Sequence, residues 1–116
     1  MLPAVHRLRR STDFLEVTRS GTRGKHGALT VHVLLSRNNN PGLPRVGVVA
    51  SKAVGNAVER HAVARRIRHA AQTRIAGWPA GSRIVIRALP GAAQRSWATL
   101  LTDLDIALGR AGLPRH

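Results

Sequence analysis

The sequence has 116 residues, with 19 lysine and arginine side chains against 5 aspartate and glutamate, and a formal charge of +14 at pH 7. This length predicts a single domain over residues 1–116, and the positive excess indicates a polyanionic partner, because uncompensated charge destabilises a compact chain. The lack of cysteine excludes disulfides and cysteine-based zinc sites and fits the reducing cytoplasm that we expect as its location. No stretch approaches the roughly 18 apolar residues that span a bilayer, and no signal peptide is visible, so we expect no membrane partner.

The first half of the sequence predicts one short helix followed by strands. Ser11 is placed to cap a helix over residues 12–19. Alternating apolar residues predict half-buried strands over 29–35 and 45–51, with a polar loop over 38–43 between them. The glycines before residue 29 leave that stretch ambiguous and allow a short extra strand there.

The second half predicts a long central helix, a strand and a last helix. The central helix begins near Asn56 and ends before Gly77, with an apolar stripe of Val63, Ile67 and Ala70. A strand follows over 83–89. Ser96 can cap a last helix whose apolar stripe comprises Trp97, Leu100, Leu101, Leu104, Ala107 and Leu108.

This order of elements predicts an α+β fold, a two-layer sandwich in which helices cover a mixed sheet of about four strands. The strands on either side of the central helix could pair in parallel. The ordinary crossover of that kind is right-handed.

The central helix also carries a basic face. The side opposite the apolar stripe gathers His61, Arg65, Arg68, His69 and Gln72, with Arg66 on one flank and Arg60 near the stripe. No acidic residue follows Glu59 on this helix, so pairing one turn apart cannot neutralise the arginines. Small residues at the start of the helix let phosphates approach its N-terminal amides. We therefore expect this helix to contact phosphates.

Catalytic and metal-binding patterns are missing. His61 and His69 lie too far apart on the helix to share one metal ion, and the few carboxylates are scattered. The sequence therefore predicts no catalytic side chain, no metal ligands and no small-molecule substrate.

Three stretches resemble the protein subunit of bacterial ribonuclease P. Residues 55–58 read Gly-Asn-Ala-Val, the family's signature before a run of Arg-Asn-Arg-x-x-Lys-Arg-x-x-Arg, and Arg45-Val-Gly-Val-Val-Ala-Ser-Lys52 precedes them. The opening Arg7-Leu-Arg-Arg10 with Phe14, and Ile84-Val-Ile-Arg-Ala88, are similar to the family's two ends. The middle motif is specific, whereas the ends are weak alone.

The resemblance implies a sandwich with an unusual left-handed β-α-β crossover. It implies an accessory subunit of an endoribonuclease whose partners are ribonuclease P RNA and precursor tRNA. The RNA subunit would bind magnesium and cut the phosphodiester that releases the 5′ leader. The protein would contact the RNA subunit with its arginine helix and hold the leader between the sheet and the first helix.

The family's functional positions can be placed on this sequence. Contact with the RNA subunit is implied for Lys52, Asn56, Arg60, His61, Arg65, Arg66 and Arg68. The leader cleft is implied for Phe14, Thr18, His32, Arg9 and Arg10. His61, Ala62 and Ala64 depart from the signature and remove two of its cations, and Thr18 and His32 stand where relatives often carry aromatic rings.

Two other functions remain open. A ribosomal-type or translation-factor-type RNA-binding module would share the sheet and helices without a role in tRNA cleavage. A DNA-binding regulator would use residues 56–74 as a recognition helix, although a strand rather than a helix precedes it.

Overall fold

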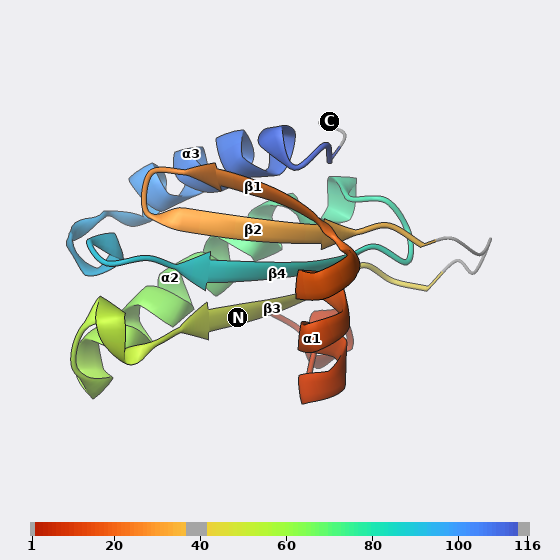
Figure 1. The fold of residues 1–116 in the computed structure, drawn as a ribbon. Coiled ribbons are helices and arrows are strands. Elements are labelled where there is room, and N and C mark those ends of the chain that lie inside the picture. The colour runs from red at the N-terminus through yellow and green to blue at the C-terminus, as the bar shows by residue number, and fades with distance from the viewer. Residues whose placement is uncertain (1, 37–41, 114–116) are drawn as a thin grey trace.

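The computed structural model describes residues 2–36 and 42–113, so most of the loop expected over 38–43 lies outside the described residues. The predicted order of elements is confirmed (Figure 1). The helices are α1 Ser11–Ser20, α2 Ala57–Arg74 and α3 Trp97–Arg110. The strands are β1 Thr22–His26, β2 Leu29–Leu34, β3 Arg45–Ala50 and β4 Arg83–Ala88, so the ambiguous stretch before residue 29 is a strand.

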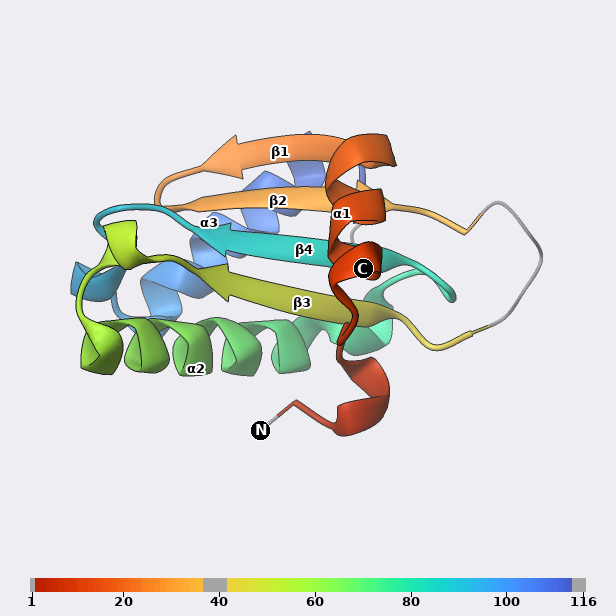
Figure 2. The ribbon, with the colours of Figure 1, turned by 60° about the horizontal axis from the view of Figure 1, so that its bottom comes forward.

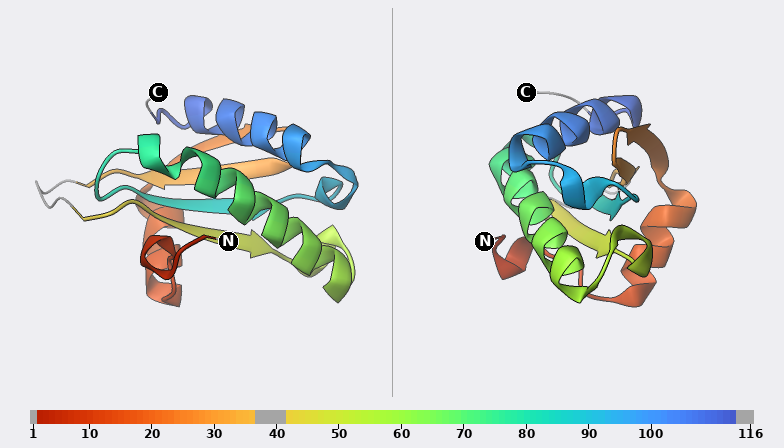
Figure 3. Two further views of the ribbon diagram at one scale, coloured as in Figure 1. Left: turned by 180° about the vertical axis from the view of Figure 1, so that it is seen from behind. Right: turned by 90° about the vertical axis from the view of Figure 1, so that its left-hand side faces the viewer.

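The four strands form one mixed sheet in the order β1-β2-β4-β3. β1 with β2 and β2 with β4 are antiparallel, whereas β3 and β4 are parallel and are joined through α2. When the sheet is viewed with α2 in front and both strands pointing up, β4 lies to the left of β3 (Figure 3). The crossover is therefore left-handed, against the usual rule.

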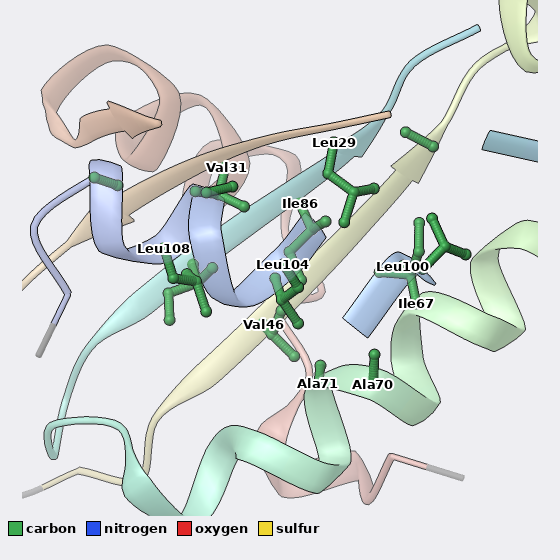
Figure 4. Packing of buried hydrophobic residues seen from close by; sticks show 14 of the residues in the cluster. Leu29, Val31, Val46, Ile67, Ala70, Ala71, Ile86, Leu100, Leu104 and Leu108 are labelled. Carbon is green, nitrogen blue, oxygen red and sulfur yellow. The ribbon is translucent and has the colours of Figure 1, made fainter. Parts of the chain in front are cut away.

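The helices lie on both faces of the sheet. α2 and α3 cover one face (Figure 3), and α1 crosses the other face (Figure 2). The main core is the layer between the sheet and the helix pair, where side chains such as Ile86, Ile67 and Leu104 are fully buried (Figure 4). Period-2 alternation in the strands and the 3.6-residue period of the helices supply this apolar layer.

A smaller cluster attaches α1 to the opposite face. Leu8, Val17 and Val85 are buried there, and Phe14 and Leu34 pack against them. This explains why the sequence shows Val85 and Leu34 out of step with the main alternation, since these side chains point to the second face. α1 rests on few apolar contacts compared with α2 and α3.

The N-terminus of α1 differs from the prediction. Ser11 is the first helical residue rather than the cap, and Arg10, which occupies the N-cap position, makes no side-chain capping bond. Ser96, in contrast, caps α3 as predicted by accepting from the Thr99 amide. No helix within residues 2–36 and 42–113 is both long and apolar enough to cross a bilayer.

Candidate nucleic-acid interface

A tight turn sets the start of α2. Asn56 and Glu59 form a capping box, in which the Asn56 Oδ1 accepts from the Glu59 amide at 2.9 Å and the Glu59 carboxylate accepts from the Asn56 amide at 3.0 Å. Gly55 has φ +153°, and a Cβ there would lie 2.6 Å from Glu59 Oε1. The capping box satisfies two of the N-terminal amides internally. Fewer free backbone amides therefore remain for a phosphate at the start of α2 than the small residues there suggested.

The exposed side of α2 carries His61, Arg65 and Arg68, which we call the helix surface. His61 and Arg65 are exposed, as the helical period predicts, whereas Arg68 is half-buried. Lys52 is exposed in the short helical turn Lys52–Val54 that leads into α2. The structure thus places four of the residues predicted to contact the RNA subunit at the start of α2 and along its exposed side: Lys52, His61, Arg65 and Arg68.

Two further arginines of α2 have different surroundings. Arg66 donates from Nη1 to the backbone oxygens of Ala93 and Arg95, each at 3.3 Å, so it fastens α2 to the segment before α3. Arg60 is half-buried, and its Nε is buried without a hydrogen-bond partner among the described residues. These side chains lie at the edges of the helix surface, as their helical positions predict.

The carboxylates of the chain are engaged away from the helix surface. Glu16 accepts from Arg83 at 2.6 Å, Arg74 pairs with Asp105 at 2.9 Å, and buried Asp103 accepts from Arg95 at 3.1 Å. The hydrogen bond from Arg83 lowers the pKa of Glu16 below its ordinary value.

Asp13 lies 3.5 Å from Arg83, and Glu59 belongs to the capping box. Within the described part of the chain, Arg65 and Arg68 make no ion pair. Their charges remain available to a polyanion.

A second basic region lies on the sheet face that α1 crosses. The strand register places Arg23 opposite His32, Lys25 opposite Thr30, and Arg87 opposite Thr30 from the other side. The three cations are exposed, and the imidazole of His32 is half-buried between Arg23 and Arg87. We call Arg23, Lys25, His32 and Arg87 the sheet surface.

His32 is held in its neutral form. Burial lowers the pKa of its imidazole, and the positive charges of Arg23 and Arg87 lower it further. Its Nδ1 is buried without a hydrogen-bond partner among the described residues. A neutral ring flanked by two guanidinium groups can stack on a base or bond to it while the arginines hold phosphates.

The other predicted cleft residues are arranged around α1. Phe14 packs with its ring over Gly47 of β3, where a Cβ would collide with the ring. Thr18 uses its hydroxyl within the helix, donating to the Phe14 and Leu15 oxygens at 3.0 and 3.1 Å.

Arg9 and Arg10 are exposed just before α1, next to Leu8, whose amide donates to Val46 of the edge strand β3. They therefore lie at the β3 edge, whereas Arg23 and Lys25 lie on β1 at the other edge.

Sequence reasoning missed Arg23, Lys25 and Arg87. The sequence does hold a signal for Arg87, because Ile84, Ile86 and Ala88 alternate along the strand predicted over 83–89 and Arg87 must then point to the opposite face. Arg23 and Lys25 depend on the pairing of β1, which the sequence left ambiguous.

The described residues contain no cluster of three or more side chains that could hold a metal ion. The five carboxylates are committed to ion pairs, backbone amides or the capping box. The donor set of the described residues therefore does not suit a magnesium site.

Comparison with known proteins identifies the family. The sequence model of the family Ribonuclease P matches residues 2–112. The chain is 45% identical to the ribonuclease P protein component of Salinispora tropica, covering 99% of this chain and 96% of that protein. It is 48% identical to the corresponding protein of Streptomyces griseus, covering 95% and 94%.

Solved structures agree in fold. The Staphylococcus aureus RNase P protein superposes with a TM-score of 0.78 at 22% identity, over 90% of this chain and 93% of that one. The Thermotoga maritima RNase P protein gives a TM-score of 0.71 at 22% identity, over 84% and 90%. With a family match across residues 2–112 and relatives above 40% identity over nearly the whole chain, the protein belongs to the ribonuclease P protein family.

Proposed function

We propose that this chain is the protein component of ribonuclease P and helps to remove the 5′ leader from precursor tRNA in the cytoplasm. Its partners would be the catalytic RNA subunit and precursor tRNA. The observation that carries the proposal is the presence of two basic surfaces on opposite sides of the sheet in a member of this family. Two separated polyanion sites suit a protein that joins two RNAs.

The helix surface is the proposed contact for the RNA subunit. Its guanidinium groups stand on a helix that is packed against the sheet and α3, so they are preorganised for a folded RNA backbone. Such contacts position an RNA without reading its sequence. Lys52 extends this contact beyond the start of α2.

The sheet surface is the proposed contact for the single-stranded leader. Arg23, Lys25 and Arg87 would hold its phosphates, while His32 and the half-buried ring of Phe14 would meet its bases. The single imidazole in place of a larger aromatic ring would give weak stacking and thus modest sequence preference.

The chemistry of cleavage is assigned to the RNA subunit. The five carboxylates, which could otherwise serve as acid or base, are already bonded to cations, a backbone amide or the capping box, and this supports the assignment. Magnesium is expected to be bound mainly by the RNA subunit, where it would stabilise charge at the phosphodiester that is cut. The protein would raise the affinity for substrate and neutralise phosphates near the cleavage site.

The test is cleavage of precursor tRNA at low magnesium by the RNase P RNA of the same source, with and without this protein. Cleavage at the mature 5′ end that requires the protein supports the proposal. RNA binding without any stimulation of cleavage would favour the ribosomal-type RNA-binding module instead.

A second experiment separates the two surfaces. His32→Ala should weaken the binding of precursor tRNAs with long leaders and leave the affinity for the RNA subunit unchanged. Equal affinity of wild type and variant across several leader lengths would remove His32 from the leader site.

A further inference from the structure

A ring pair lies beside the helix surface and takes no part in the proposed contacts. His69 of α2 and Trp97 of α3 face each other with ring centroids 5.0 Å apart and planes inclined by 31°. His69 is exposed, whereas Trp97 is half-buried and packs on the main core. The core thus holds the Trp97 indole in place, and the indole supports the solvent-exposed imidazole of His69.

Cations surround this ring pair. A hollow of about 490 Å³ over α2 is lined by His69 and Trp97 together with His61, Arg65, Arg66 and Arg68. Arg65 and Arg66 stand one turn before His69, on positions that neighbour it along the helix. The hydrogen bonds of Arg66 to the Ala93 and Arg95 oxygens hold this side of the hollow in place.

The indole also has an unused donor. Trp97 Nε1 is buried without a hydrogen-bond partner among the described residues, although a buried indole N–H usually finds an acceptor. Nucleobases carry such acceptors at their edges.

We infer that His69 and Trp97 form a stacking platform for one unpaired nucleobase of the RNA held by the helix surface. Stacking needs a flat ring and a base that is free of its own stack, and the neighbouring arginines supply the phosphate contacts of the same nucleotide. The inference rests on the proposed function, since the RNA subunit is the partner that the helix surface would bind. It adds a base contact to a surface otherwise suited only to phosphates.

The alternative is a purely structural ring pair that helps to pack α2 on α3. The two roles predict different effects on the affinity for ligands with and without bases. A base-stacking role changes affinity for RNA and leaves affinity for a polyanion without bases unchanged, whereas a structural role changes both or neither.

The experiment measures binding of RNase P RNA and of linear polyphosphate to wild type, His69→Ala and His69→Phe. We expect His69→Ala to weaken RNA binding by about tenfold, in the range of a lost base–ring stack, with polyphosphate binding unchanged. His69→Phe keeps a ring at this position and should restore RNA affinity. His61→Ala is the matched control, because His61 lies on the same helix with no described ring beneath it, and it should affect both ligands alike.

Equal losses on both ligands, or wild-type RNA affinity of His69→Ala, would overturn the inference. Tryptophan emission of the unmodified protein gives an independent readout, since of its two tryptophans Trp78 is 8% exposed and belongs to the core. RNA should lower the emission and polyphosphate should not. If wild type neither binds this RNA nor stimulates its cleavage, the proposed function fails; if it does both and the His69 variants match it, only the platform fails.

Discussion

The helix surface and the sheet surface carry the same charge on different supports. On α2, Arg65 and Arg68 project from one helix with a main-core stripe behind them, and no carboxylate of the described chain pairs with them. On the sheet, cations from β1 and β4 flank the neutral ring of His32. A helix presents cations in a row for a backbone, whereas neighbouring strands place cations around a ring and can meet both phosphate and base.

The supports also differ in how firmly they are held. α2 lies in the main core and begins with a capping box. α1, which borders the sheet surface, is attached by the small cluster of Leu8, Val17 and Val85. Damage to packing should therefore impair the sheet surface before it impairs the helix surface.

The largest expected effect comes from removing charge from the helix surface alone. Arg65→Ala combined with Arg68→Ala should weaken RNA-subunit binding by about ten- to a hundredfold and lower the salt-dependence slope by up to about one unit per arginine. The dependence of precursor binding on leader length should not change. Binding titrations over a range of salt concentrations measure both quantities.

Arg19→Ala is the control for this double variant, because it removes an exposed charge from α1 outside both surfaces. It should lower the RNA affinity much less than Arg65→Ala or Arg68→Ala alone. Loss of leader dependence with unchanged RNA-subunit affinity in the double variant would reverse the assignment of the two surfaces.

Local sequence signals predicted much of this arrangement. The stripe of Val63, Ile67 and Ala70 placed Arg65 and Arg68 outward; the stripe is buried and Arg65 is exposed as predicted, whereas Arg68 is half-buried. The spacing of Asn56 and Glu59 also encodes the capping box, although the sequence reasoning assigned Asn56 to RNA contact alone.

Non-local features were beyond such reasoning. Arg66 binds carbonyls 27 and 29 positions away, and no periodicity identifies these acceptors. The sheet surface requires the register of β1, β2 and β4, and Gly24 within β1 and Gly27 just after it obscure the alternation of that strand. The left-handed crossover contradicts the general rule, so only the family resemblance anticipated it.

The second largest expected effect tests whether disturbed packing beneath α1 impairs the sheet surface and spares the helix surface. Gly47→Val would place side-chain atoms where the Phe14 ring now lies, and overpacking of this kind costs about 1–3 kcal/mol. Thermal unfolding should shift to lower temperature and the preference for long leaders should fall, while RNA-subunit affinity stays within about twofold because α2 is on the other face of the sheet.

Two variants test the cause. Gly42→Ala is the matched control, because no heavy atom of the described residues, chain neighbours apart, lies within 4 Å of the added Cβ, and it should leave the unfolding temperature unchanged. Adding Phe14→Ala to Gly47→Val removes the collision and should recover part of the lost stability. If Gly47→Val unfolds at the wild-type temperature, Phe14 does not pack on β3 as tightly as the structure indicates.

The smallest expected effect concerns the pH dependence that distinguishes the sheet surface. Burial and the nearby Arg23 and Arg87 depress the pKa of His32 in the folded state below the ordinary value of about 6.5. As the pH falls, His32 is therefore protonated in the unfolded chain before it is protonated in the folded protein. The contribution of His32 to the free energy of unfolding is largest above about pH 6.5 and is lost as the pH falls through the pKa of the folded state. His32→Phe should remove this part of the acid sensitivity, measured as the difference between wild-type and variant unfolding curves.

Leader binding should show the opposite trend through the same group. Phosphates beside His32 favour its protonated form, so the affinity for long leaders should rise modestly, by roughly two- to threefold, as pH falls from 8 towards 6. The rise should vanish in His32→Phe and persist in His61→Gln, which alters a histidine of the helix surface only. A rise that survives in His32→Phe would place the responsible proton elsewhere, and the chemical distinction between the two surfaces would then rest on Arg23, Lys25 and Arg87 rather than on the imidazole between them.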